Sequence, residues 1–278
     1  KYEKLWEDIE MPYPDNFNDA YEAREQTAGN TEMTMDYFTR EDMKMTPPDS
    51  LTPRQKNRWK QYGFGTNQIV SPSDSLAPQQ VRQWKYQRYI KDYLATVKSV
   101  DDNVGRVLTY LDDNGLAENT IVIYASDQGF FLGEHGFFDK RFMYEESLKM
   151  PFVIRYPRKI NARTVVTDIV SNIDLAPTLL DMAGVAIPRA VQGKSFFANL
   201  KGETPKNWRQ SMYYHYYEYP FYHRVQPHYG IRNQRYKLIH FYYDIDVWEL
   251  YDLQNDPNEM NNLICDLEYA DVIDELKI

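Results

Sequence analysis

Cysteine is nearly absent from this sequence of 278 residues, which contains a single thiol at Cys265. One cysteine can form neither an internal disulfide nor a thiolate metal cluster, so both are excluded. Long apolar runs are absent as well: no stretch of about 18 hydrophobic residues occurs, so no membrane-spanning helix is predicted. The chain begins at Lys1 with neither a methionine nor a hydrophobic stretch, which predicts a start inside a longer protein.

Positive charge is also scarce. The 32 Lys and Arg residues are outnumbered by 41 Asp and Glu, which gives a net charge of -9 and argues against a nucleic-acid partner. An anionic substrate stays possible if a few cations gather in one pocket, because the local field decides binding. The 24 Tyr and 5 Trp residues are typical of sugar-binding clefts and equally of plain cores.

Regular patterns divide the chain into three parts. Residues 1–75 are rich in turn signals and are predicted to be a loop-rich part of the core that either lines a cleft or wraps the surface. From Pro78 apolar residues recur at helical spacing up to Asn114 and Gly115. Apolar, β-favouring runs follow at 120–125 and 151–155, and a further helix is predicted to end at Gly184.

This alternation of helix and strand predicts an α/β core over residues 76–200, with a largely parallel sheet and flanking helices. Beyond Gly193 the pattern changes to short aromatic stretches that alternate along the chain and are separated by turn residues. These predict a small antiparallel sheet, on which a helix at 267–276 packs. Residues 201–278 are therefore expected to form a small C-terminal α+β subdomain.

The residues best suited to chemistry come directly after the first predicted strand. In open α/β sheets ligands bind beyond the carboxyl ends of the strands, and Asp127 and Gln128 occupy that place. Carboxylate and amide oxygens suit Ca²⁺ or Mg²⁺, although an Asp there often only caps a turn. Lys140 follows a glycine-rich stretch and can bring a point charge to an anion held beside the metal.

These residues belong to a series of motifs through which the sequence resembles the C-terminal half of the type I sulfatases. The matching motifs are Ser-Asp-Gln-Gly at 126–129, Leu-Gly-Glu-His-Gly at 132–136, Asp-Lys at 139–140, Tyr-Glu-Glu-Ser at 144–147, Asn-Ile-Asp-Leu-Ala-Pro-Thr at 172–178, Gln-Gly-Lys-Ser at 192–195 and Glu-Leu-Tyr-Asp-Leu at 249–253. The resemblance covers about residues 80–265 well. It implies an alkaline-phosphatase-like fold and hydrolysis of sulfate esters on a carbohydrate.

The resemblance also implies roles for particular residues. Asp127 and Gln128 match the pair that completes a site for one Ca²⁺ ion, whose other ligands are expected outside this chain. Lys140 matches the lysine that contacts the sulfate. A divalent cation and a lysine that both draw on the sulfate oxygens polarise the sulfur and stabilise charge in the transition state.

The nucleophile of the family does not match this chain. It is formylglycine, made from Cys or Ser in a Cys/Ser-x-Pro/Ala-x-Arg motif, whereas Cys265 is followed by Asp-Leu-Glu. The nearest mimic, at residues 75–79, ends in Gln79 where the motif requires Arg. The nucleophile is therefore expected in a missing N-terminal segment of the same protein, and this fragment alone is expected to be inactive.

Several other side chains are candidates for binding the substrate. Asp139 and Arg141 flank Lys140 and either bind sugar hydroxyls or form a local salt bridge. His135 is either a sulfate contact or a hydrogen-bonded structural residue. His215, His223 and His228 lie in the aromatic C-terminal region, and any one of them is a candidate for binding the sugar.

Three functions remain open on the sequence. The preferred hypothesis is a sulfatase that acts on the 6-sulfate of N-acetylglucosamine in glycosaminoglycan or mucin glycans. The triplet at residues 139–141 looks most like the corresponding residues of such sulfatases. The first alternative is a phosphohydrolase of the alkaline phosphatase superfamily, although such enzymes tend to use two transition metals and several histidines. The second is a non-catalytic anion-binding fragment. A periplasmic, secreted or lysosomal location follows from the resemblance only.

Overall fold

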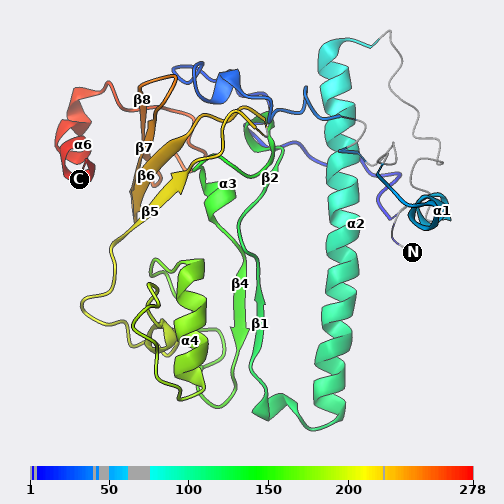
Figure 1. Ribbon diagram of the computed structural model, residues 1–278, viewed down its shortest axis with the longest axis vertical. Helices are drawn as coiled ribbons and strands as arrows, with labels where there is room; N and C mark the ends of the chain where they lie inside the picture. Colours follow the sequence, from blue (N-terminus) through cyan, green and yellow to red (C-terminus); the bar gives the residue numbers. More distant parts are fainter. Residues whose placement is uncertain are drawn as a thin grey trace.

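The computed structural model describes residues 2, 5–39, 42–43, 50–61, 76–221 and 223–277 (Figure 1). Its helices are α1 (Pro53–Gln61), α2 (Pro78–Asp113), α3 (Glu145–Leu148), α4 (Leu175–Met182), α5 (Phe197–Leu200) and α6 (Ala270–Leu276). Its strands are β1 (Val122–Ala125), β2 (Phe131–Leu132), β3 (Phe138–Asp139), β4 (Phe152–Arg155), β5 (Ser211–Tyr216), β6 (His228–Asn233), β7 (Tyr236–Phe241) and β8 (Val247–Asp252). Within these ranges no helix is both long enough and apolar enough to cross a bilayer.

The long helix α2 matches the helix predicted from apolar spacing. It begins after Ala77 with Pro78 at its first position, where a missing N–H costs nothing, and the Gln80 side chain accepts a hydrogen bond from the Ala77 N–H. It ends at Asp113 with Asn114 as its C-cap, and Gly115 then takes a left-handed φ of 66° that glycine adopts without strain. The helix stands along one side of β1 and β4 (Figure 1).

The strands β1 and β4 form where the sequence predicts strands, but their orientation corrects the prediction. They pair antiparallel with each other, from Val122 opposite Arg155 to Ala125 opposite Phe152. Parallel pairing needs a crossover, usually a helix of a dozen or more residues. Residues 126–151 instead contain the β2–β3 hairpin and the four-residue α3, which return the chain beside β1.

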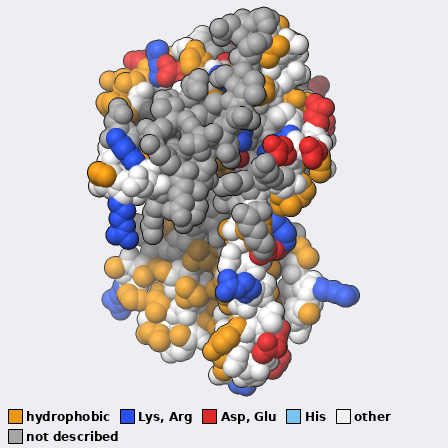
Figure 2. Space-filling view, turned by 90° about the vertical axis from the view of Figure 1, so that its right-hand side faces the viewer, with side chains coloured by type: hydrophobic (Ala, Val, Ile, Leu, Met, Phe, Trp, Pro, Cys, Tyr) orange, Lys and Arg blue, Asp and Glu red, His pale blue; other side chains and the backbone are white. Residues whose placement is uncertain are grey.

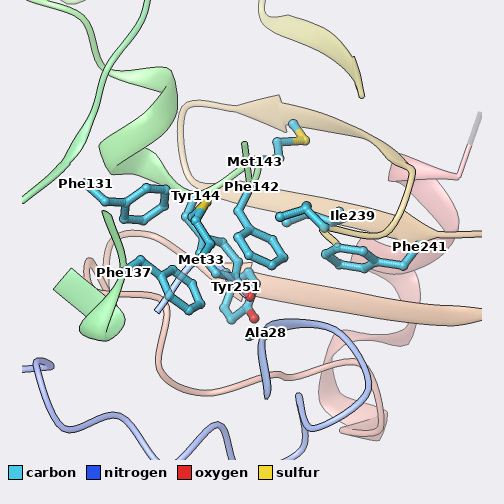
Figure 3. Packing of buried hydrophobic residues seen from close by; sticks show 11 residues of the cluster. Ala28, Met33, Phe131, Phe137, Phe142, Met143, Tyr144, Ile239, Phe241 and Tyr251 are labelled. Atoms are coloured by element: carbon cyan, nitrogen blue, oxygen red, sulfur yellow. The ribbon is translucent and has the colours of Figure 1, made fainter. Parts of the chain in front are cut away.

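The C-terminal antiparallel sheet confirms its prediction. Strands β5 to β8 lie in sequence order with antiparallel pairing throughout, and α6 packs on part of the outer face through Ile273 and Leu276. The inner face covers Phe142, Met143 and Tyr144 (Figure 3). Gly230 allows this contact, because a Cβ there would lie 2.6 Å from the Met143 sulfur.

The described N-terminal residues wrap around both α2 and the β2–β3 hairpin and contribute to the core. Thr34 forms a β-bridge with Phe137. A buried cluster joins this segment to α2 and β3; its members are Met11, Phe17, Met35, Phe38, Met43, Tyr86, Ile90 and Phe138. The loop-rich segment therefore holds α2 against the hairpin that carries the candidate site.

Candidate active site

The loop that carries Asp127 and Gln128 lies directly against α3. It leaves β1 at Ala125, and the Gly129 N–H donates a hydrogen bond of 2.8 Å to the Ser147 carbonyl. A Cβ at Gly129 would lie 2.0 Å from the Glu146 carbonyl oxygen, far inside a van der Waals contact. Only glycine permits this approach, so the position of the loop depends on the position of α3.

Asp127 and Gln128 offer oxygen atoms that fit a hard cation. The Asp127 carboxylate is exposed, and its carbonyl accepts a hydrogen bond of 3.2 Å from the Asn172 side chain. Calcium takes six to eight oxygen ligands, so these two side chains fill only part of a shell. Among the residues that the structure describes, no group of three or more His, Cys, Asp or Glu could hold a metal.

Lys140 follows β3 and carries an available positive charge. Its side chain is half-buried, and no carboxylate of the described ranges lies within salt-bridge distance of it. Its neighbour Asp139 has a positive φ of 68°, and the Asp139 carboxylate lies 2.5 Å from the Arg141 guanidinium. The Tyr214 hydroxyl donates to the Arg141 carbonyl at 3.1 Å, which joins this turn to β5.

His223 lies beside Asp139, and it is one of the three C-terminal histidines that the sequence makes candidates for binding the sugar. Its Nε2 lies 3.3 Å from the Asp139 carboxylate, and its ring packs edge-on against Phe138 at 4.9 Å between centroids. Its carbonyl accepts hydrogen bonds from the Glu32 N–H and the Thr31 hydroxyl. No local sequence signal connects His223 with Asp139, because only the folded chain brings them together.

His135 lies in the core, and its ring is fully buried. Its Nδ1 lies 2.7 Å from the Asp19 carboxylate, which also binds Arg24. Its ring packs against Tyr144 at 5.1 Å between centroids. The buried ring of His135 therefore contacts core residues, and it is not accessible to a ligand in this conformation.

His215 and His228 lie on opposite faces of the C-terminal sheet. His228 faces inward, and its Nδ1–H donates to the Gln226 carbonyl at 2.8 Å. His215 faces outward between the hydroxyls of Tyr213 and Tyr242, at 2.9 and 2.8 Å. The sequence makes each of them a separate candidate for binding the sugar, and from opposite faces they do not contribute to one subsite.

Burial of His228 predicts a loss of stability in acid. Burial lowers the pKa of His228 from 6.5 to about 4, with a smaller opposing effect of the Gln226 carbonyl. Between these values the unfolded chain binds a proton that the folded chain does not, so stability falls as pH decreases from 6.5 to 4. The shift corresponds to about 3 kcal/mol.

Urea denaturation across this pH range, on wild type and on His228→Phe, measures the effect. The variant is expected to lose about 3 kcal/mol less on acidification. Glu249 and Glu259 are buried with raised pKa values and act in the opposite sense, but both proteins share them and their contribution cancels in the difference. Parallel stability curves would contradict the assignment.

Comparison with known proteins identifies the family. The Sulfatase family matches residues 10–185, and the family described as N-sulphoglucosamine sulphohydrolase, C-terminal, matches residues 133–278. The N-acetylglucosamine-6-O-sulfatase of Bacteroides thetaiotaomicron is 46% identical over 279 residues, which cover 94% of this chain and 50% of the relative.

Two solved structures show the fold. A protein solved in complex with its substrate, D-glucosamine-2-N,6-O-disulfate, has a TM-score of 0.84 at 45% identity and covers 99% of this chain and 59% of its own. A phosphonate monoester hydrolase of Silicibacter pomeroyi has a TM-score of 0.63 at 28% identity, over 72% of this chain and 41% of its own. This chain thus spans about half the length of such relatives, within their alkaline-phosphatase-like fold. It belongs to the sulfatase family.

Proposed function

We propose that this chain is part of an enzyme that hydrolyses sulfate esters on a carbohydrate, and specifically the 6-sulfate of N-acetylglucosamine in glycosaminoglycan or mucin glycans. The observation that carries the proposal is the half-buried Lys140 beside the polar cluster of Asp139, Arg141 and His223. One cation without a carboxylate partner among the described residues suits an anionic group, and the flanking polar side chains suit sugar hydroxyls. The relatives named above support the substrate class.

Each part of the site has a distinct role in this proposal. Lys140 binds a sulfate oxygen and stabilises the charge that develops there, while Asp139, Arg141 and His223 orient the sugar. Asp127 and Gln128 supply two ligands of a Ca²⁺ ion, which polarises the sulfate when bound. The formylglycine nucleophile lies outside this chain, in keeping with the absence of its motif, and a periplasmic, secreted or lysosomal location fits such substrates.

The other half of the sulfatase core is the partner we propose for the open side of β1 and β4. Both strands have an unpaired edge within the described residues, and Tyr124 and Val153 are 45% and 65% exposed. Figure 2 shows hydrophobic side chains on the lower part of the molecule, seen from the side on which α2 stands in Figure 1. With the exposed Cys265 replaced by serine, the thiol of a Val153→Cys variant should react with maleimide in this chain alone and be protected once the other half is present.

Two sugar esters that differ in one atom test the reaction. The whole protein that contains this chain is incubated with N-acetylglucosamine 6-sulfate and, separately, with the 6-phosphate. Sulfate release without phosphate release is the expected result. Faster phosphate release would favour the phosphohydrolase, to which the likeness to a phosphonate monoester hydrolase points. Hydrolysis of neither ester would leave an anion-binding module.

Calcium is tested by its effect on thermal stability. If Asp127 and Gln128 help to bind the ion, Ca²⁺ at about 100 times its Kd should stabilise the whole protein by about 2.7 kcal/mol relative to EDTA. Asp127→Ala should abolish that difference in Tm, whereas Asp112→Ala, an exposed carboxylate at the end of α2, should keep it. An equal Ca²⁺ response in wild type and Asp127→Ala would remove Asp127 from the metal site.

A further inference from the structure

A buried cluster of charges joins the C-terminal sheet to α3. Lys237 on β7 is fully buried, and its Nζ lies 2.9 Å from Glu145 and 2.7 Å from Glu259. Arg232 on β6 lies 3.1 Å from the second Glu145 oxygen, and the exposed Lys149 lies at the same distance. Burial alone would raise the pKa of Glu145, but the charges of Lys237 and Arg232 outweigh it and lower that pKa to about 2.

Glu259 completes the cluster, because it contacts both Lys237 and the start of α3. Its second carboxylate oxygen accepts a hydrogen bond of 2.6 Å from the Glu145 N–H, the first N–H of the helix. Its backbone has a φ of 52°, which is strained for a residue with a side chain. The chain is therefore held in an unfavourable conformation that places this carboxylate against α3.

Stability alone does not account for this cluster. Buried ion pairs lose much of their attraction to desolvation, and apolar residues of the same volume often stabilise a protein at least as well. Hydrogen bonds between charged groups differ from apolar contacts in that they fix direction. The bonds to Glu145 therefore fix the orientation of α3 and not merely its burial.

The orientation of α3 matters because the site is built on it. Gly129 follows the predicted metal ligands Asp127 and Gln128, and its N–H donates a hydrogen bond to the Ser147 carbonyl. It lies so close to the Glu146 carbonyl that no Cβ would fit between them. The buried residues 142–144, which connect Lys140 to the start of α3, pack with residues of the inner face of the sheet (Figure 3). A rotation of α3 would thus displace the Asp127 loop and strain the Lys140 turn.

We infer that Lys237 and Glu259 are positioning residues for the active site, which act through Glu145 and α3 on the loop of Asp127 and Gln128. Neither is placed against the substrate. The C-terminal sheet would in this way set the distance between the metal ligands and Lys140. This inference rests on the proposed function for its catalytic consequence, and on the contacts of α3 for its structural one.

The test uses a charge-neutral double variant of the whole protein. Lys237→Met alone would leave two carboxylates facing each other in the core and unfold the protein in part. Lys237→Met with Glu259→Gln removes one charge of each sign and keeps the Glu145–Arg232 pair, while the new amide retains an oxygen that accepts from the Glu145 N–H. The matched control is Arg235→Met with Asp252→Asn, an ion pair of 2.7 Å on the same sheet whose hydrogen bonds involve no residue of α3.

Two measurements are compared between the double variant and the control. One is the steady-state rate on the sulfated sugar, which gives kcat and KM. We expect kcat to fall about 100-fold in the double variant and KM to change little, because the reacting groups are misplaced by a fraction of a bond length or more. The other is hydrogen exchange of the Gly129 amide in metal-free protein, which is expected to be faster in the variant only. The control should match wild type in both.

The two measurements also separate this inference from the proposed function. A folded variant whose kcat and Gly129 exchange both equal those of the control overturns the positioning role. If wild type itself releases no sulfate, the proposed function fails. Gly129 exchange then still decides whether Lys237 and Glu259 hold the Asp127 loop, since it needs neither metal nor substrate.

Discussion

Lys140→Ala in the whole protein is expected to lower kcat about 100- to 1000-fold, the usual loss when one group that stabilises transition-state charge is removed. The fold should be unaffected, because the side chain is half-buried and has no carboxylate partner among the described residues. Steady-state rates on the 6-sulfated sugar, together with a melting curve, separate the two effects. Lys206→Ala, an exposed lysine outside the site, is the control and should keep full activity.

The alanine result is sharpened by Lys140→Arg, which keeps the positive charge but changes its geometry. If Lys140 acts as a compact point charge on a sulfate oxygen, the arginine variant should recover only part of the rate. A wild-type rate in Lys140→Ala, with the protein folded, would place the sulfate elsewhere and withdraw the main support for the proposed function.

Arg24→Met is expected to cost about 3–5 kcal/mol of stability, because it removes the guanidinium that pairs with a buried carboxylate. Arg24 and Asp19 have 1% and 2% of their side chains exposed and lie 2.8 Å apart. Burial opposes ionisation of Asp19, but the hydrogen bonds from His135 and Tyr21 and the charge of Arg24 outweigh it and lower its pKa. Urea denaturation at neutral pH measures the change.

Arg82→Met is the matched control for this prediction. Arg82 also pairs with an aspartate, Asp36, but both side chains are about one third or more exposed. Exposed pairs contribute at most about 1 kcal/mol, so the control should change stability little. If the two substitutions lowered the free energy of unfolding equally, Arg24 would not be what holds the N-terminal residues against the core. His135 would then depend on other contacts for its position.

Local patterns were enough to predict much of the fold. The spacing of apolar residues gives α2, with Pro78 and Gly115 at its two ends, because both the period and the caps are local properties. Alternation in the aromatic region likewise gives β5 to β8. The antiparallel pairing of β1 with β4 was not predictable in this way, since an apolar strand has the same composition in either orientation.

In the candidate site, too, contacts between neighbours in sequence were predictable, and contacts between distant segments were not. Asp139, Lys140 and Arg141 are neighbours in sequence, so a single turn necessarily keeps them together, and Asp127 follows a strand as predicted. The contacts of His223 with Asp139 and of Lys237 with Glu145 connect distant segments. Nothing in the spacing of these residues indicates such contacts, because they depend on how the C-terminal sheet is placed over the core.

The pairing of β1 with β4 also closes residues 126–151, which contain Asp127 and Lys140, into a loop whose two ends meet at Ala125 and Phe152. Closing such a loop costs conformational entropy, which the strand pairing and the contacts inside the loop must offset. A slip of one residue in that pairing would turn every side chain of β1 to the other face and shift Asp127 relative to α3. The geometry of the proposed metal ligands thus depends on the register of four pairs of residues.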